Sequence, residues 1–262
     1  MINFAHATAI DDDQRGLIHP SWTQGRSAFG GIGAGLALSA IGPLIPEGRR
    51  VRSVMAQFTA PMGPGPVTTT ARINRSGRAV TQAQAQVFTD GQLAVSVLAT
   101  VAADRPSDIH LDAPMPSEIA GRDACTEMPY IDGITPKFTQ HFRYHWATLD
   151  SLPFQGGGRA NIEGYVAFKK PTAPTPAAIL ALIDSWPAPI LGMVNRPIAA
   201  STVTWMVNLY AVPDPTQDQT YRYSSTATVA GNGYSDVDEQ LWDSRGRLIA
   251  TGRQFVAEFS GT

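Results

Sequence analysis

Four glycines, at positions 30, 31, 33 and 35, stand at the start of an apolar run in the stretch SAFGGIGAGLALSAIGP (27–43). Glycine is a poor helix former, so its crowding at a helix start raises the question of what the bare backbone does. Free N–H groups and the partial positive charge of a helix N-terminus suit a nucleotide phosphate or another ligand that the backbone approaches closely. The alternative is that the glycines only permit close packing, which we favour for Gly33 and Gly35.

Two histidines and a cysteine are further candidates for chemistry. His141 and His145 alternate with large residues in KFTQHFRYHW (137–146), a segment typical of a strand. Such a pair could bind a metal, but no third ligand or supporting carboxylate stands nearby. We therefore expect a solvent-facing or sheet-packing role for both, and neither a metal nor another cofactor. Cys125 lies in a polar, loop-like context without a neighbouring base, so we interpret it as a bystander.

Composition limits the partners. The chain has 262 residues, of which 16% are charged, with a formal net charge of -2. This balance offers no basic surface for nucleic acid, and no apolar run approaches the length of a membrane span. The single cysteine fits a reducing compartment, and the first residues lack the pattern of a signal peptide. We expect a cytoplasmic protein.

The elements that would position these residues are mostly strands. Eight segments alternate apolar and polar residues, and hairpin signals such as Asp90-Gly91 separate them. The predicted strands are 51–60, 66–74, 79–88 and 93–102 in the first half, and 200–211, 220–229, 234–242 and 247–259 in the second. A helical stretch precedes each set, at 30–42 and 176–194. Strand-like sequence precedes each helix, at 2–10 and 16–22, and again at 136–146 and 161–169.

The two halves resemble each other beyond composition. Residues 76–102 lie without gaps on residues 231–257, so that Gly91 falls on Gly246 and Ala99 on Gln254. In the preceding strand, Ser53 falls on Thr202. We therefore predict two copies of a β-β-α-β-β-β-β unit, each an antiparallel sheet wrapped on one helix. The predicted division is an N-terminal repeat (1–102), a Pro- and Asp-rich linker (103–135) and a C-terminal repeat (136–262).

This order of elements excludes a dinucleotide-binding loop. That fingerprint needs Gly-x-Gly-x-x-Gly between parallel strands. Here Leu36 stands where the third glycine belongs, and the strands that follow are linked by hairpins and are therefore antiparallel.

A helix within a curved antiparallel sheet, present twice in one chain, resembles the α+β double hotdog fold. More narrowly, the chain resembles the acyl-CoA thioesterase II family. The resemblance spans nearly the whole chain. It is carried in the first half by Trp22 with GRSAFGGIGAGLAL (25–38), RSVMAQFTAPMGPGPV (52–67) and INRSGRAVTQAQAQVFTDGQLAVS (73–96). In the second half it is carried by GGGRANIEGYVAFKKP (156–171), LALIDSWPAPIL (180–191), STVTWMVNLY (201–210) and LWDSRGRLIATGRQ (241–254).

The resemblance implies a fold and a reaction. The two repeats would form one continuous pseudo-dimer, and the protein would hydrolyse acyl-CoA thioesters. Asp184, at the start of the second central helix, Thr202 and Gln254 would hold and activate a water molecule. The helix start at Phe29, Gly30 and Gly31 would polarise the thioester carbonyl.

The residues also have simpler interpretations. Asp184 could be a helix cap ahead of Trp186-Pro187, and a threonine in a strand is usually a strand former. Gln254 shares an inward-looking face with Leu248, Ala250, Gly252 and Val256, where a buried amide needs partners. Because the other repeat has Ala99 there, we prefer a site residue, and we expect one working site per chain.

Other polar residues have surface or core interpretations. Gln82, Gln84 and Gln86 share one face of a strand and predict a solvated sheet surface. The cluster Asp236, Asp238 and Glu239 predicts a charged outer edge, with contact of one member to the pocket as the alternative. His19 and Trp22 precede the glycines, where both could line an acyl entrance; the alternative for an aromatic residue such as Trp22 is the core.

Two other functions remain open: a hotdog enoyl-CoA hydratase, and a non-catalytic binding protein for acyl-CoA or an acyl carrier. A hydratase usually needs an Asp/His pair near the helix start, and none of the five histidines lies on a predicted central helix or just after one. The binding protein would be favoured if Asp184, Thr202 and Gln254 did not converge. Either way the partner is an acyl-CoA or a related thioester, and the repeats could also assemble into a homo-oligomer.

Overall fold

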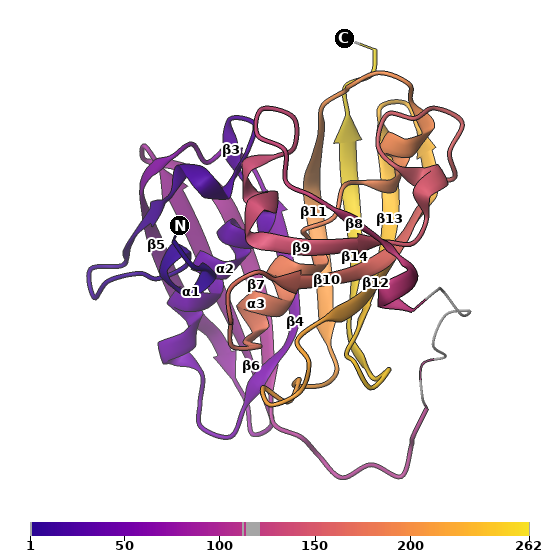
Figure 1. Cartoon of the computed structure of the whole chain (residues 1–262). Helices are drawn as coiled ribbons and strands as arrows, with labels where there is room; N and C mark the ends of the chain where they lie inside the picture. The colour runs from indigo at the N-terminus through magenta and orange to yellow at the C-terminus, as the bar shows by residue number, and fades with distance from the viewer. Residues whose placement is uncertain (1, 112, 114–120, 262) are drawn as a thin grey trace.

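The structure, a computed structural model, describes residues 2–111, 113 and 121–261. Twelve strands form one antiparallel sheet in the order β1-β5-β6-β7-β4-β11-β14-β13-β12-β10-β9-β8. The sheet curves around two helices, α2 and α3, which pack against each other on its inner side (Figure 1). This is the double hotdog architecture expected from the sequence. Part of the expected linker, residues 112 and 114–120, lies outside the described residues.

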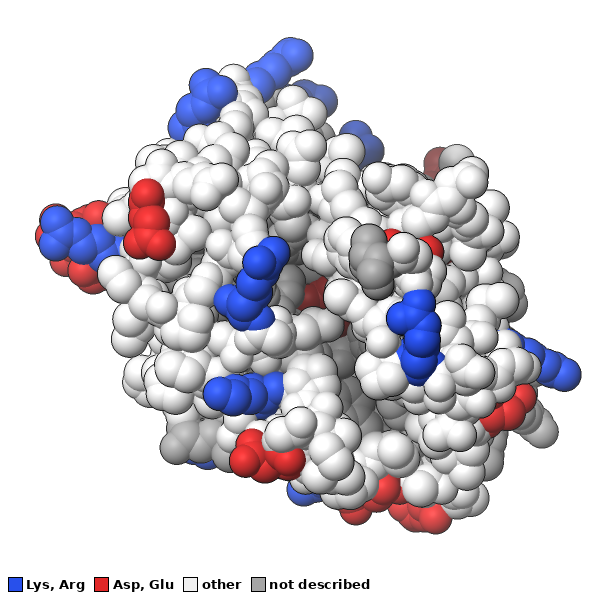
Figure 2. Space-filling model, turned by 90° about the horizontal axis from the view of Figure 1, so that it is seen from above, with Lys and Arg blue, Asp and Glu red and all other residues white. Residues whose placement is uncertain are grey.

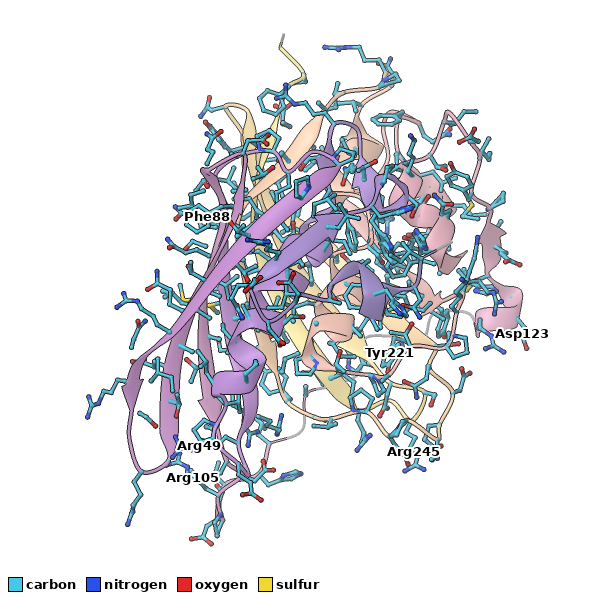
Figure 3. All side chains as sticks on the ribbon, turned by 90° about the vertical axis from the view of Figure 1, so that its left-hand side faces the viewer. Arg49, Phe88, Arg105, Asp123, Tyr221 and Arg245 are labelled. Atoms are coloured by element: carbon cyan, nitrogen blue, oxygen red, sulfur yellow. The ribbon has the colours of Figure 1, made fainter. Side chains whose placement is uncertain are left out.

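The first half contributes five strands to the sheet. They are β1 (Arg15–Ile18), β4 (Arg50–Phe58), β5 (Gly65–Ser76), β6 (Val80–Thr89) and β7 (Gln92–Ala102). Asp90 and Gly91 both have positive φ, 50° and 76°, as the tight hairpin predicted between β6 and β7 requires. A two-stranded ribbon, β2 (Thr23–Gln24) and β3 (Ser27–Ala28), leads into α2. In Figure 3, Phe88 near the end of β6 and Arg49 before β4 mark opposite ends of this half.

The second half contributes seven strands. They are β8 (Thr126–Met128), β9 (Phe142–Trp146), β10 (Asn161–Phe168), β11 (Ala200–Leu209), β12 (Tyr221–Gly231), β13 (Tyr234–Trp242) and β14 (Leu248–Glu258). β8 lies within the stretch expected as linker and pairs with β9. The linker therefore also supplies an edge strand, while the division into two domains stays a prediction.

Of the expected strands, one is wrong and one is shorter than predicted. Within 2–10 the chain forms a short helix, α1 (Phe4–Ala7), because the Asn3 side chain accepts a hydrogen bond from the His6 amide and caps it. Within 136–146 the first residues form a 3-10 helix, η4 (Lys137–His141), and only Phe142–Trp146 is a strand. The predicted β-β-α-β-β-β-β unit thus lacks its first strand in the first copy, and in the second copy that strand is shortened to β9.

The halves join at the centre of the sheet, where β4 pairs with β11. Met55 pairs with Met206, and on either side Val54 pairs with Val207 and Ala56 with Trp205. Each half therefore presents corresponding residues to the other about a local two-fold axis through the methionine pair. Each central strand also has a register shift, between Val51 and Ser53 in β4 and between Thr202 and Thr204 in β11.

The two central helices are apolar on all sides, as buried helices are. α2 (Gly30–Ile41) agrees with the predicted stretch and buries every residue from Gly31 to Leu38. α3 (Pro176–Ile183) begins at a Thr175 cap with proline in its first turn. It ends far earlier than predicted, because Pro187 and Pro189 prevent its continuation; the chain then forms η6 (Pro189–Met193). No helix of the described chain has the length and apolarity to cross a membrane.

Candidate active site

The Asp184 carboxyl lies where the two central helices meet. The prediction that Asp184 starts the second helix is wrong: it is the C-cap residue of α3. Its side chain caps the other helix instead. Oδ2 accepts a hydrogen bond of 2.7 Å from the Gly31 amide in the first turn of α2. A carboxylate at a helix N-terminus is favoured by the unpaired N–H groups and the helix dipole.

This environment leaves one Asp184 oxygen for other work. Oδ1 accepts no hydrogen bond from the residues that the structure describes. Burial raises the pKa of Asp184 to about 7, and the hydrogen bond from Gly31 opposes the rise. A carboxyl with one anchored oxygen, one uncommitted oxygen and a pKa near neutrality suits proton transfer.

The glycines at the start of α2 have different neighbours. A Cβ on Gly31 would lie 2.6 Å from the Phe29 ring and 2.8 Å from the Ala181 backbone of α3. A Cβ on Gly30 would lie 2.8 Å from Asp184 Oδ2. Close packing of both helices and of the carboxyl thus requires glycine here. Within the described chain the Gly30 amide, the first of the helix, has no hydrogen-bond partner.

The remaining residues of this region belong to the core. A Cβ on Gly33 would meet Met62 and one on Gly35 would meet Thr8, which agrees with the packing role favoured for both. Phe29 is 1% exposed and stacks between Trp22 and Phe138. Trp22 is equally buried, so of its two interpretations the core holds.

Thr202 reaches the inner face of the sheet through a β-bulge. In β11, Trp205, Val207 and Leu209 are buried, so strict alternation would turn Thr202 outward. The register shift between Thr202 and Thr204 reverses this. The Thr202 hydroxyl donates a short hydrogen bond to Gln254 Oε1.

Gln254 is buried on the face that alternation predicts, and its amide is fixed at both ends. Oε1 accepts from Thr202, and Nε2 donates to Glu239 Oε1 at 2.9 Å. Glu239 also accepts from Trp205 Nε1 at 2.9 Å and from the Tyr223 hydroxyl at 3.0 Å. Only 2% of Glu239 is exposed. Burial first, and the charge of Asp184 second, raise its pKa to about 8.

The expectation that Glu239 belongs to a charged outer edge is therefore wrong. Asp236 and Asp238 do lie on the outer face, next to Arg253, but alternation puts Glu239 with Val237 and Leu241. The gapless repeat alignment concealed this, since the turn after β13 is one residue longer than the turn after β6. Alternation within β13 was the signal that could have found Glu239.

The strand registers locate the equivalent residues of the first half. With Gln254 on Ala99, the pairing of Thr202 with Val256 corresponds to that of Val51 with Val101. Thr202 thus falls on Val51, which corrects the expected match to Ser53. By the same register Glu239, opposite Gly252, falls on Ala85, opposite Val97. All three polar positions of the second half are apolar and buried in the first.

Two parts make up this candidate site: Asp184 with the start of α2, and the Thr202–Gln254–Glu239 chain of hydrogen bonds. The effect of the Asp184 charge on the pKa of Glu239 relates them electrostatically. From above, Figure 2 shows a hollow near the middle of the face, with acidic atoms recessed in it and Lys and Arg side chains around it.

The histidines and the cysteine have structural environments. His141 lies flat on Trp22, with ring centroids 3.7 Å apart, and its Nε2 lies 2.9 Å from Ser21 Oγ. Burial lowers the pKa of His141 to about 4. His141 packs within the core from the 3-10 helix η4, so the expected solvent-facing or sheet-packing role on a strand is wrong for this residue. Burial raises the pKa of the Cys125 thiol, which disfavours a reactive thiolate.

Sequence profiles of one family match both halves. The profile of the acyl-CoA thioesterase N-terminal domain matches residues 18–102, and that of the C-terminal domain matches residues 122–257. No curated protein matches the chain.

Solved structures match nearly end to end. A conserved protein of unknown function with a hot dog fold from Alicyclobacillus acidocaldarius has a TM-score of 0.86 and 22% identity, over 99% of this chain and 98% of its own. A candidate thioesterase II from Thermobifida fusca has a TM-score of 0.84 and 24% identity, over the same shares. An acyl-CoA thioesterase II from Mycobacterium marinum has a TM-score of 0.72 and 16% identity, over 99% of this chain and all of its own. At these identities the structures show a shared fold.

Proposed function

Since the chain belongs to the acyl-CoA thioesterase family, we propose that it hydrolyses acyl-CoA thioesters at Asp184, Thr202 and Gln254. The observation that carries the proposal is the Asp184 carboxyl, which is anchored through Oδ2 on the Gly31 amide and keeps Oδ1 uncommitted. The Thr202 hydroxyl donates its proton to an amide oxygen and not to a base that could activate it as a nucleophile, so in this proposal the attacking group is water.

Asp184 acts as the general base. A water molecule donates one proton to Oδ1 while its oxygen attacks the thioester carbonyl carbon. The raised pKa of Asp184, about 7, makes the carboxylate a better proton acceptor than an exposed one near neutral pH. When the tetrahedral intermediate collapses, the C–S bond breaks and the CoA thiolate takes the proton from Asp184. The products are the free acid and CoA.

The start of α2 stabilises the developing oxyanion. The Gly30 amide is the first N–H of the helix and is unpaired within the described chain. An N–H donor fixed at the positive end of a helix favours negative charge on the carbonyl oxygen in the transition state. Gly31, which already donates to Asp184, positions the base, and buried Phe29 supports the helix start.

Thr202 and Gln254 orient the water. The Thr202 hydroxyl donates its proton to Gln254 Oε1, so its oxygen can only accept a hydrogen bond from a water molecule. A water that donates one proton to Thr202 and the other to Asp184 turns its lone pair toward the carbonyl carbon. These roles assign a purpose to two of the polar side chains, Thr202 and Gln254, that replace apolar ones of the first half.

The experiment is to measure thiol release from butyryl-, octanoyl- and palmitoyl-CoA by the wild-type chain and by Asp184→Asn. Asparagine keeps an acceptor for the Gly31 amide but cannot take a proton. We expect the variant to fold and to lose about 10²–10⁴-fold in kcat. Unchanged turnover would contradict the mechanism. Wild-type binding without thiol release would favour an acyl-CoA or acyl-carrier binding protein instead.

A hydratase remains the less favoured reaction. His141 is packed on Trp22, and His19 is engaged with Ser21. Neither offers the acid–base partner that hydration of an enoyl thioester needs beside the carboxylate. Incubation of crotonyl-CoA with the protein distinguishes the reactions, because hydration leaves the thiol bound and hydrolysis releases it.

A further inference from the structure

We propose that Glu239 is a positioning residue that fixes the side-chain amide of Gln254 and thereby makes Thr202 a hydrogen-bond acceptor for the attacking water. The inference rests on the proposed function for its kinetic consequence. The orientation of the Gln254 amide by the Glu239 carboxylate does not depend on the reaction and can be tested without it.

The contacts of Glu239 define the direction of the amide. A carboxylate is an acceptor only, and Glu239 Oε1 lies 2.9 Å from the Gln254 nitrogen. The opposite orientation of the amide would place the Gln254 oxygen against the carboxylate and is disfavoured by repulsion. The Gln254 oxygen therefore faces Thr202.

The direction of the amide determines what Thr202 presents. With the Gln254 oxygen facing it, the Thr202 hydroxyl donates to that oxygen and its lone pairs are left for water. With the amide reversed, the NH₂ group would occupy a Thr202 lone pair, and the hydroxyl proton would point to the water instead. A water that accepts that proton turns a lone pair away from the carbonyl carbon, which lowers its reactivity.

The fold makes room for Glu239 specifically. A Cβ on Gly252, directly across the β13–β14 ladder, would collide with the Glu239 carboxylate. In the first half the equivalent pair is Ala85 opposite Val97. Where the first half has Ala85, the second half has the larger Glu239, and where the first half has Val97, the second half has the smaller Gly252. This double exchange keeps the core filled while it introduces the carboxyl group.

Two ionisable groups influence the charge of Glu239. Asp184 raises the pKa of Glu239, and Tyr223 from β12 stays neutral because burial and the carboxylate raise its own pKa. Trp205 from β11 and Gln254 from β14 are neutral donors. A neutral Glu239 needs an acceptor for its own proton, and reversal of the Gln254 amide supplies one. Full activity thus requires both Asp184 and Glu239 in the carboxylate form.

The kinetic test is Glu239→Gln, with Asp238→Asn as the matched control. Asp238 is the preceding residue of the same strand, faces outward and pairs with Arg253. We expect kcat of Glu239→Gln to fall about tenfold or more with little change in KM, and Asp238→Asn to behave as the wild type. In the wild type, log kcat should rise with pH with a slope approaching about two, and in Glu239→Gln with a slope of about one. Wild-type kcat and slope in Glu239→Gln would overturn the proposal.

A second readout does not depend on turnover. In the NMR spectrum of isotope-labelled protein, the side-chain NH₂ signals of Gln254, assigned with Gln254→Glu, should shift with pH in the wild type and in Asp238→Asn. In Glu239→Gln they should be displaced and should lose this titration. If the wild type releases no thiol but these signals behave as expected, only the proposed function fails. If thiol is released but the Gln254 signals ignore Glu239→Gln, the positioning role fails.

Tyr223→Phe keeps the test decisive if Glu239→Gln does not fold. This variant removes one hydrogen bond that lowers the pKa of Glu239 and leaves the bond to Gln254. We expect the pH of half-maximal activity and the midpoint of the Gln254 titration to rise together, with kcat at high pH retained. Unchanged midpoints would overturn the proposal.

Discussion

At the scale of single residues, two buried carboxyls are held in a state that favours chemistry over stability. The pKa values of Asp184 and Glu239 are raised to about 7 and about 8, from the ordinary values of 3.8 and 4.5. At pH values between the ordinary and the raised pKa, each of these carboxyls keeps its proton in the folded chain and loses it in the unfolded chain. The contribution of these two carboxyls to the free energy of unfolding therefore decreases as pH rises from about 4 to about 8. His141, whose pKa burial lowers to about 4, contributes with the opposite sign in the acidic part of this range.

Asp184→Asn should reduce the decrease of the free energy of unfolding with rising pH. An amide stays neutral, and with the Asp184 charge gone the pKa of Glu239 falls toward its ordinary value. We expect the variant to be more stable than the wild type above pH 8, by about 1–3 kcal/mol, although it is inactive. At pH 4 both carboxyls are neutral in the wild type, and the difference should shrink.

Urea unfolding of both proteins across this pH range measures the effect. Asp236→Asn is the control, because its carboxyl faces outward beside Arg253. A parallel loss of stability with pH in the wild type and Asp184→Asn would contradict the raised pKa of Asp184.

At the scale of elements, the start of α2 is where packing and chemistry meet. An alanine methyl at Gly31 would press on the backbone of α3 at Ala181, which cannot turn aside, and on the Phe29 ring. At Gly33 it would lie 2.5 Å from the mobile end of Met62, with Val95 the next neighbour. Both substitutions gain about 1 kcal/mol of helix propensity. We expect Gly31→Ala to be the more destabilising by about 1–3 kcal/mol and to lower kcat, since it moves the anchor of Asp184.

Thermal unfolding and thiol release of the two variants compare these sites directly. The prediction concerns their order, so each serves as the control of the other. A Gly31→Ala protein as stable and as active as Gly33→Ala would show that the helices can separate at this point without cost.

Most elements were predictable because period-two alternation and hairpin residues define β4–β7 and β11–β14. The predictions that were wrong concern places where the strand register shifts or where local hydrogen bonds favour a helix over a strand. A bulge turns Thr202 inward, and an extra turn residue shifts β13 by one position against the repeat. Pro187 and Pro189 prevent the continuation of α3, which ends just before Asp184. Gln254 could be predicted as buried, while its partner Glu239 lay hidden beside two exposed aspartates.

At the scale of the whole molecule, the backbone is arranged with two-fold symmetry about Met55 and Met206, but the buried side chains do not follow this symmetry. The sheet repeats, but Val51, Ala85 and Ala99 stand where the second half has Thr202, Glu239 and Gln254. Because one half has a buried chain of polar residues and the other has apolar residues at the same positions, we expect a single site per chain, although the fold has two equivalent places for one.

Calorimetric titration of Asp184→Asn with the octanoyl thioether of CoA, which cannot be hydrolysed, should therefore give one ligand per chain. Binding is expected to survive in this variant because asparagine can still accept from the Gly31 amide and keep α2 in place. Ala99→Gln should leave the stoichiometry at one, since an isolated amide in the first half has neither the Thr202 hydroxyl nor the Glu239 carboxylate as partner and only destabilises the core. A stoichiometry of two in Asp184→Asn would mean that the apolar half also binds the ligand, and that the polar residues of the second half serve the reaction alone.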